Sequence, residues 1–304
     1  MKTGRAGGEP AAGEPAAIRT GTLDDVAAIR SILGAHGNDS AEGERAGPDV
    51  VGPYIVHLLL HHRVLVSADG TGTIVAFGAV VDTGLGYHLA DLFVRPDRLG
   101  AGYGRPLLAE LYGDRWPRTT LASEDPRALP SYVRAGMAPR SPALYLEAPA
   151  GAARDARRGR VAGFEVVDGD PVELCALEAA WSGADRAADH AFWGSLPGAD
   201  PMVVHDADGV VALAYARDRQ SGPSSRTLDR MLVRPGADPV GPLFAVLDRA
   251  AARAATLDLL VLGPHPALRE LFELGFRLVD RDTYCAGPTD PVDPARRLPN
   301  NGML

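Results

Sequence analysis

Three glycines at alternate positions, Gly100, Gly102 and Gly104, lie between an apolar stretch at 87–94 and a leucine-containing stretch at 105–111. Alternating glycines let the backbone turn so that successive N–H groups point to one side. A helix beginning here would add the partial positive charge of its N-terminus at the same place. The pattern of strand, glycine loop and helix predicts a diphosphate cradle, the alternative being a plain turn between two elements.

The loop does not fit the two common nucleotide-binding motifs. A dinucleotide fingerprint needs Gly-x-Gly-x-x-Gly early in a βαβ unit, with an acidic residue about 20 positions later. Here the spacing is Gly-x-Gly-x-Gly, and the acidic residues that follow, Glu124 and Asp125, belong to a predicted loop. A Walker loop would need Gly-Lys-Ser/Thr, which the sequence lacks. A different diphosphate ligand is therefore expected.

The region around this loop occurs twice, at an offset of 139 residues. Segment 92–96, Leu-Phe-Val-Arg-Pro, returns at 231–235 as Met-Leu-Val-Arg-Pro, and 128–137 returns at 267–276 with its alanine and glycine in place. An ungapped match over roughly 50 positions predicts two copies of one fold. The copies can therefore be compared position by position.

The second copy has lost most features of the loop. It keeps only Gly241 of the three glycines, and Pro239 and Pro242 remove two N–H donors. Asp238 adds a negative charge where a phosphate would lie. We expect poor phosphate binding here and a structural role for this copy, or a role as a wall of the first copy's substrate pocket. Residues His190, Phe192 and Trp193, in a stretch that resembles a loop, are candidates for that wall, ordinary packing being the alternative.

Hydrophobic periodicity and turn residues predict the elements around these sites. In the first copy, strands are expected at 18–20, 64–67, 74–81, 87–94, 119–122 and 143–147, and helices at 23–35, 50–62, 102–111 and 127–135. In the second copy, strands are expected at 202–205, 210–217, 228–233, 257–262 and 280–285, and helices at 171–181, 243–254 and 267–274. The expected fold class is α+β, with two tandem domains that each contain a mixed, mostly antiparallel sheet flanked by helices. The expected divisions are a disordered lead-in at 1–17, a domain at 18–150, a linker at 151–162, a domain at 163–287 and an irregular tail at 288–304.

Composition limits the functional class. The chain has 304 residues, 46% hydrophobic and 23% charged, which is typical of a soluble globular protein. Its net charge of −8 argues against nucleic acid or an anionic membrane as a partner. Two cysteines provide neither a disulfide framework nor a metal-spaced cluster, so a reducing cytoplasm is expected. His57 and His61 have a spacing that can hold a metal, but no third ligand is identifiable, and we expect no bound metal.

The residues of the loop resemble the signature of the GNAT N-acetyltransferase superfamily. Its acetyl-CoA motif is a strand with Val-x-Pro, followed by (Arg/Gln)-x-x-Gly-x-(Gly/Ala) and a helix. Val94, Pro96, Gly102 and Gly104 match this motif, whereas Leu99 stands where the family usually has arginine or glutamine. A second signature, Ala-x-x-x-Tyr-x-x-x-Gly-Phe, is matched at 128–137 except for its last residue, which is Met137.

The resemblance implies that acetyl-CoA lies between the two strands beside the loop. Its pyrophosphate would contact the backbone of 100–104, and its pantetheine arm would pair like an extra strand with the backbone of Phe93 and Val94. An acceptor amine would attack the thioester directly, helped by a strand N–H that polarises the carbonyl. The cofactor-binding residues expected on this basis are Leu92, Phe93, Val94, Leu99, Gly100, Ala101, Gly102, Tyr103, Gly104 and Arg105.

Two residues are expected to move protons. Tyr132 is the proposed acid for the leaving CoA thiolate, the alternative being a tyrosine that merely packs on the sheet, and the second copy has Leu271 at this position. His88, six residues before Val94, is expected on the same strand face and is the proposed base, with wall-forming packing as the alternative. Asp91, which by strand parity faces away together with Phe93, is the second candidate base.

These expectations combine into an acetyl-CoA-dependent N-acetyltransferase that acts on a primary amine of a small molecule through its first copy. The chain would work as a monomer or homodimer. Leu99 and the degenerate second copy also suit a non-catalytic acyl-CoA-binding sensor or scaffold. A protein N-acetyltransferase is a further alternative, which would need an open acceptor groove.

Overall fold

The computed structural model describes residues 17–36, 48–151, 161–219, 224–300 and 302–304. The expected lead-in, except for Ala17, and most of the expected linker lie outside these residues. No helix in the described ranges is both long enough and apolar enough to cross a bilayer.

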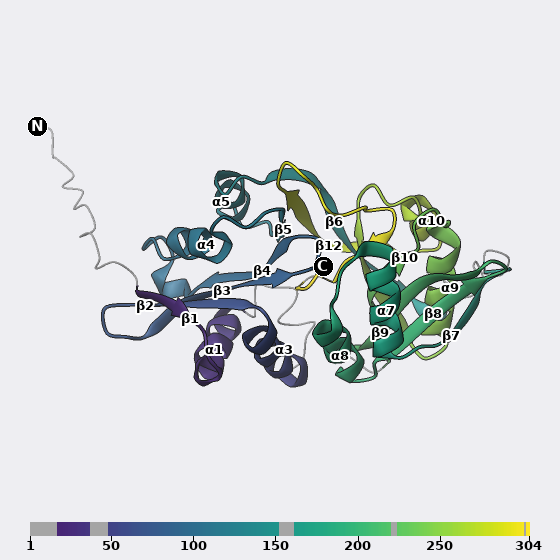
Figure 1. The fold of residues 1–304 in the computed structure, drawn as a ribbon, viewed down its shortest axis with the longest axis horizontal. Helices are drawn as coiled ribbons and strands as arrows, with labels where there is room; N and C mark the ends of the chain where they lie inside the picture. The colour runs from purple at the N-terminus through teal and green to yellow at the C-terminus, as the bar shows by residue number, and fades with distance from the viewer. Residues whose placement is uncertain (1–16, 37–47, 152–160, 220–223, 301) are drawn as a thin grey trace, which may run out of the picture.

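The first half follows the predicted order of elements closely. Its strands are β1 (Ala17–Thr20), β2 (Arg63–Ala68), β3 (Ile74–Asp82), β4 (Tyr87–Val94), β5 (Arg118–Ala122) and β6 (Ala138–Pro149). Its helices are α1 (Val26–His36), α3 (Pro48–His61), α4 (Gly104–Tyr112) and α5 (Ala128–Arg134), with short 3-10 turns η1 (Leu23–Asp25) and η2 (Pro96–Arg98). α1 and α3 cover one face of the sheet, and α4 and α5 lie over the other (Figure 1).

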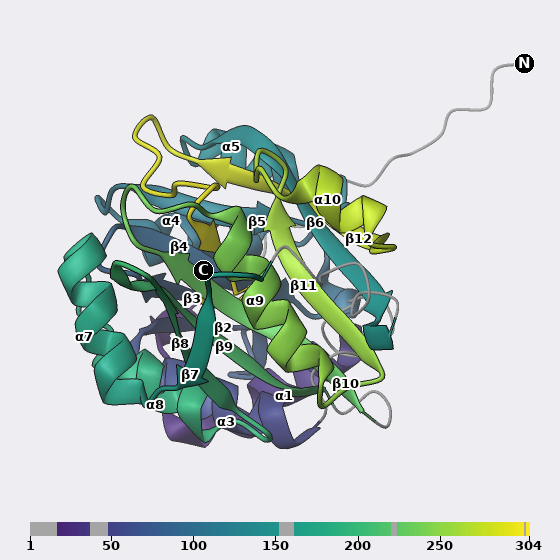
Figure 2. The ribbon, with the colours of Figure 1, turned by 90° about the vertical axis from the view of Figure 1, so that its right-hand side faces the viewer.

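The second half repeats this arrangement. Its strands are β7 (Glu165–Asp168), β8 (Asp200–Asp206), β9 (Gly209–Arg219), β10 (Ser225–Val233), β11 (Thr256–Leu262), β12 (Arg277–Ala286) and β13 (Arg297–Leu298). Its helices are α7 (Pro171–Ser182), α8 (Ala187–Ser195), α9 (Val240–Ala251) and α10 (Leu268–Glu273). Figure 2 shows α9 running along the sheet of this half. The stretch with His190, Phe192 and Trp193 is therefore a helix, α8, and the expectation of a loop there was wrong.

The strands in the described part of the chain join into one 13-stranded sheet, ordered β1-β2-β3-β4-β5-β12-β6-β11-β10-β9-β8-β7, with β13 added beside β10. The two halves exchange their last long strands. β12 of the second half pairs with β5 of the first, and β6 of the first half pairs with β11 of the second. β6 was expected to close the sheet of its own half at 143–147, but it is longer and lies between β12 and β11.

Burial follows the exchange. Leu146 and Ala148 of β6 belong to the core under α9, whereas Cys285 of β12 belongs to the core under α4 and α5. Burying apolar side chains stabilises a sheet face by roughly 25 cal/mol per Å². Each half thus receives part of its core from the other half. The predicted α+β fold with two copies is confirmed, but the copies do not form two separate sheets.

A cluster of buried charges holds the second half together around Glu178 of α7. Its carboxylate accepts hydrogen bonds from Arg230 of β10 (2.9 Å), Arg297 of β13 (3.2 Å) and His190 of α8 (2.9 Å). Burial by itself would raise the pKa of Glu178, but the neighbouring cations and the His190 hydrogen bond hold this pKa well below its usual range. The segment 288–304, expected to pack irregularly, therefore contains a strand tied to this cluster.

Replacing Glu178 with glutamine should destabilise the protein strongly. Glu178→Gln leaves Arg230 and Arg297 buried without their counter-charge, which costs about 3–5 kcal/mol of unfolding free energy. Glu173→Gln, on the exposed face of the same helix, is the matched control and should cost less than about 1 kcal/mol. Urea unfolding at neutral pH measures both. Equal stabilities of the two variants would contradict the account of the cluster.

Candidate functional site

An opening between β4 and β5 lies at the centre of the predicted site. The two strands pair in parallel only at Tyr87, His88 and Leu89, opposite 118–120. Beyond Leu89 the pairing with β5 ends, whereas the opposite edge of β5 stays paired with β12 over 119–122. The free edge of β4 therefore runs from the vertex, where the two strands part, to the glycine loop.

One inserted residue in β4 decides which side chains face this vertex. Against β3, Val81 pairs with His88 and Ala79 with Asp91, so Ala90 is an extra residue that forms a β-bulge. Val81 and Ala79 both pack toward α1 and α3. His88 therefore shares the face of Asp91, and its expected position on the face of Val94 was wrong. The bulge adds one residue to the alternation on which that expectation rested.

Asp91 is buried beneath α3. The hydroxyl of Tyr54 donates a hydrogen bond to Asp91 Oδ2 at 2.9 Å. Burial raises the pKa of Asp91 to about 6, while the Tyr54 hydrogen bond acts in the opposite direction. A carboxyl group with this pKa is mostly ionised at neutral pH and can still accept a proton efficiently.

His88 is completely buried on the same face. Its Nδ1 lies 3.1 Å from Oγ1 of Thr119 in β5, across the parallel pair at the vertex. The two candidate bases thus both lie at the vertex. Asp91 contacts Tyr54 of α3, and His88 contacts Thr119 of β5. The geometry leaves His88 fixed between strands, as expected for a wall residue, and gives Asp91 the pKa suited to a base.

The glycine loop has the backbone that its sequence predicts. Gly100 and Gly102 have φ angles of +81° and +92°, values that side-chain-bearing residues rarely adopt. Within the described part of the chain, no acceptor takes the N–H groups of Gly100, Gly102 or Tyr103, whereas Ala101 donates to Arg98 O at 3.2 Å. α4 begins at Gly104, so its N-terminus adds further amides beside the loop.

Leu99, which departs from the family's motif, is not replaced by a neighbouring donor. Leu99 is partly exposed and cannot donate a hydrogen bond, and Arg98 next to it pairs with Asp69 at 3.3 Å. Arg105 is exposed in the first turn of α4. His36, which the sequence analysis missed, donates from Nε2 to the carbonyl of Val94 at 2.8 Å. The sequence feature that could have pointed to this contact is the place of His36 at the end of α1, from which its side chain reaches the end of β4.

Phe93 belongs to the core rather than to an open surface. Its ring stacks on that of Phe77 with centroids 5.7 Å apart, on the face covered by α1 and α3. Leu92 and Val94 pack instead toward α4. The apolar side chains of β4 thus fix the strand from both faces and leave its backbone edge toward β5.

Tyr132 lies on α5, over the opposite face from Asp91. It packs in the core under α4 and α5, near Cys285 of β12. Burial raises the pKa of Tyr132, and the nearby Cys285, Asp282 and Asp91 act in the same direction. The hydroxyl is therefore protonated at neutral pH, as a proton donor must be.

In the second copy, the chain itself fills the place of the loop's expected ligand. The N–H groups of Val240 and Gly241, at the start of α9, each donate to the Asp238 carboxylate at 3.0 Å. A Cβ at Gly241 would lie 2.3 Å from the ring of Phe164. The surviving glycine is thus explained by close packing, and Asp238 supplies the anion at the helix N-terminus.

The opening beside β10 is filled in the same way. β13 pairs antiparallel with Met231 and Leu232, the equivalents of Leu92 and Phe93. Val233, the equivalent of Val94, donates its N–H to the carbonyl of Arg296 at 2.9 Å. The 288–304 segment therefore occupies, in the second copy, the strand position at which the first copy is expected to bind pantetheine.

The positions of Asp91 and Tyr54, candidates for a role in proton transfer, also differ between the copies. β10 has its own bulge at Asp229, the equivalent of Ala90. The next residue, Arg230, stands where the first copy has Asp91, and its guanidinium lies 4.0 Å from the ring centroid of Trp193, the equivalent of Tyr54. A tyrosine–carboxylate pair in one copy is thus a tryptophan–arginine pair in the other.

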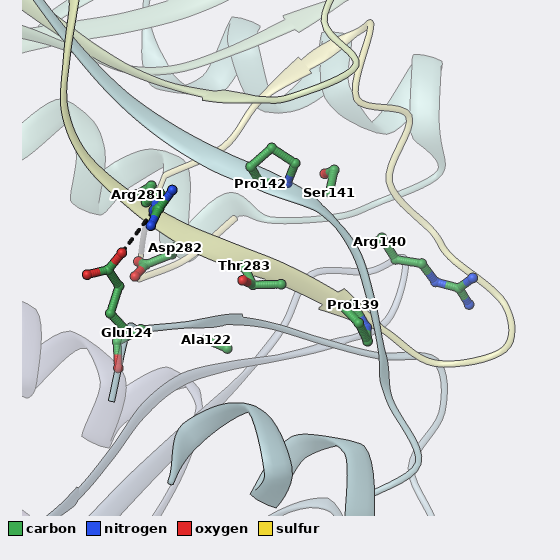
Figure 3. A pocket seen from close by; sticks show the side chains of 10 residues that line it. Ala122, Glu124, Pro139, Arg140, Ser141, Pro142, Arg281, Asp282 and Thr283 are labelled. Carbon is green, nitrogen blue, oxygen red and sulfur yellow. Dashed lines mark hydrogen bonds and ion pairs between the residues drawn. The ribbon is translucent and has the colours of Figure 1, made fainter. Parts of the chain in front are cut away.

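The exchanged strands also border a cavity of about 470 Å³ (Figure 3). An ion pair between Arg281 and Glu124, 2.9 Å long, links β12 to the end of β5 at its edge. The cavity is lined by Ala122, Ser123, Glu124, Pro139, Arg140, Ser141, Pro142, Arg281, Asp282 and Thr283.

The histidines near the end of α3 do not pair as the sequence suggested. His61 is exposed, whereas the Nε2 atoms of His57 and His62 both lie 2.8 Å from Oδ1 of Asp189 in α8. A third possible ligand, which the sequence alone did not identify, thus lies beside His57 and His62 rather than beside the pair His57 and His61. Asp189 is more than 120 positions away in sequence, and only the packing of α3 against α8 reveals it.

Comparisons with known proteins identify the fold. No family model matches the chain, and a comparison with curated proteins finds no match. A solved structure of a proposed acetyltransferase from Pyrococcus horikoshii superposes with a TM-score of 0.68 at 14% identity, covering 100% of this chain and 98% of that one. A tandem GNAT protein from the clavulanic acid biosynthesis pathway has a TM-score of 0.55 at 16% identity, covering 91% and 100%.

A third solved structure, a GCN5-related N-acetyltransferase from Anabaena variabilis, has a TM-score of 0.60 at 14% identity and covers 90% of this chain and 72% of that one. At these identities the similarity concerns the fold. The diverging parallel strands, the glycine loop and the doubled architecture agree with it. The chain therefore has the fold of the GNAT acetyltransferases in its tandem form.

Proposed function

We propose that the protein transfers an acetyl group from acetyl-CoA to a primary amine of a small molecule, and that the first copy does so. The observation that carries this proposal is the contrast between equivalent positions. Among the described residues of the first copy, the N–H groups of Gly100, Gly102 and Tyr103 have no acceptor, and no strand pairs with β4 beyond Leu89 on the side of β5. In the second copy Asp238 and β13 occupy the equivalent places. The similarity to GNAT acetyltransferases supports acyl transfer as the type of reaction.

The proposed binding mode follows from this edge. The amides of 100–104 receive the pyrophosphate of acetyl-CoA, and the pantetheine arm lies along β4 as β13 lies along β10. Acetyl-CoA supplies the activated thioester. Its carbonyl carbon then lies near the vertex, between the face of Asp91 and the face of Tyr132.

The transfer needs one proton acceptor and one donor. The amine nitrogen bonds to the carbonyl carbon, the C–S bond breaks, and the thiolate takes a proton from Tyr132. We propose Asp91 as the acceptor of the amine proton because its raised pKa suits the task and Tyr54 holds it in place. His88 remains the competing candidate on the same face.

A variant of the glycine loop tests cofactor binding. Gly102→Ala forces a side-chain-bearing residue to φ near +92° and should weaken acetyl-CoA binding by roughly tenfold or more, the equivalent of about 1.4 kcal/mol. Gly236→Ala is the matched control, since Gly236 has φ +80°, an equally open environment and a place in the second copy's loop. Calorimetric titration with acetyl-CoA measures both. Equal weakening in the control would place binding elsewhere.

The acid role is tested at Tyr132. Tyr132→Phe keeps the ring in its core position but removes the donor, so kcat should fall by about 10²-fold or more with acetyl-CoA binding unchanged. Turnover with a panel of small-molecule amines provides the measurement. Full activity in this variant would dismiss Tyr132 as the acid, and binding without turnover of any amine or peptide in the wild type would favour the sensor alternative.

The pH dependence separates the two candidate bases. A base works when deprotonated, so kcat/KM should rise as pH increases through about 6, the pKa of Asp91. Tyr54→Phe removes a hydrogen bond that lowers this pKa, so the rising limb should move to higher pH. Asp91→Asn should remove the limb and lower kcat by about 10²-fold or more. If His88→Gln removes the limb and Asp91→Asn leaves it, His88 is the base.

A further inference from the structure

Three metal-ligating side chains meet where the two halves pack together. His57 belongs to α3, His62 follows that helix directly, and Asp189 lies in α8 of the other half. Figure 1 shows α8 beside α3. The two Nε2 atoms and a carboxylate oxygen lie within 4.8 Å of one another, and all three side chains are more than nine-tenths buried.

The neighbours of this cluster fix the ligand atoms in place. Arg186 donates from Nε to Asp189 Oδ2 at 2.7 Å, which leaves Oδ1 directed at the two imidazoles. The ring of Phe192 stacks on that of His57, with centroids 4.4 Å apart and planes 12° from parallel. Residues that support the ligands from behind are typical of metal sites.

The chemistry of the donors favours zinc. Two imidazole nitrogens and one carboxylate oxygen are a common protein ligand set for Zn²⁺, with bonds of about 2.0–2.2 Å and one further position open to water. In the ion-free arrangement the histidines donate Nε2–H to Asp189. On metal binding each proton moves to Nδ1 of the same ring, so that both imidazoles stay neutral while Nε2 becomes a ligand.

We propose that His57, His62 and Asp189 form a zinc-binding site that joins the two halves. A bound ion would link α3 to α8 directly. Tyr54, which holds Asp91, lies one helical turn before His57 on α3. The ion would therefore also fix the helix that positions the candidate base, although zinc binding itself does not depend on the proposed acetyl transfer.

The test uses the full chain, treated with a chelator and then titrated with Zn²⁺ alone by calorimetry. The wild type should bind one equivalent and show a higher melting temperature, and Co²⁺ should give the absorption bands of a four-coordinate site. His62→Gln and Asp189→Asn should lose this binding. His61→Gln is the matched control, because His61 is the exposed neighbour of His62, and it should bind zinc as the wild type does.

Several results would overturn the proposal. These are a wild type that takes up no zinc, a cobalt spectrum typical of six-coordinate hydrated ions, or equal loss of binding in His61→Gln and His62→Gln. Because Asp189→Asn also removes a partner of Arg186 and can fail to fold, the cobalt spectrum of the wild type decides the matter if that variant unfolds.

Discussion

The exchange of β6 and β12 is the constraint on which the rest of the molecule depends. Each of these strands pairs with strands of the other half: β6 pairs with β11 and β12, and β12 pairs with β5 and β6. On the side away from β4, β5 therefore finds its neighbour in residues 277–286, and on the side away from β10, β11 finds its neighbour in 138–149. The core under α4 and α5, where Tyr132 lies, includes Cys285 from the second half. The second copy is thus required for the first, because without it the first copy's sheet ends at β5.

Features that both copies share are needed for the fold, whereas features that only the first copy has are the candidates for ligand binding. Both carry a bulge at the same position in their fourth strand, at Ala90 and Asp229, and both begin a helix after the following loop. The second copy satisfies its exposed backbone internally, through Asp238 and β13, since buried or cleft-facing N–H groups are costly to leave unpaired. In the described part of the first copy, the N–H groups of Gly100, Gly102 and Tyr103 have no such acceptor, and the glycines at 100 and 102 allow the positive φ angles of this loop.

Much of this could be predicted from local sequence patterns, and the failures share a physical reason. The glycine loop, most helices and strands and the doubled fold follow from spacing and periodicity, which act over a few residues. A bulge changes strand parity without any clear signal in composition, so His88 was placed on the wrong face. Strand exchange leaves no trace in the order of apolar and polar residues along β6, because β6 would bury the same side chains whether it paired with strands of its own half or of the other half. Asp189 and β13 acquire their roles from contacts more than 60 residues away.

The long separation in sequence between β5 and its neighbour β12 affects how the chain folds as it is synthesised. While the ribosome makes the second half, β5 has an unpaired edge and the core around Tyr132 lacks Cys285. Exposed strand edges attract other chains, and contacts between distant residues form slowly. Completion of the sheet therefore waits until β12 has been translated, and chaperones that shield nascent strands have most to protect in the interval between β5 and β12.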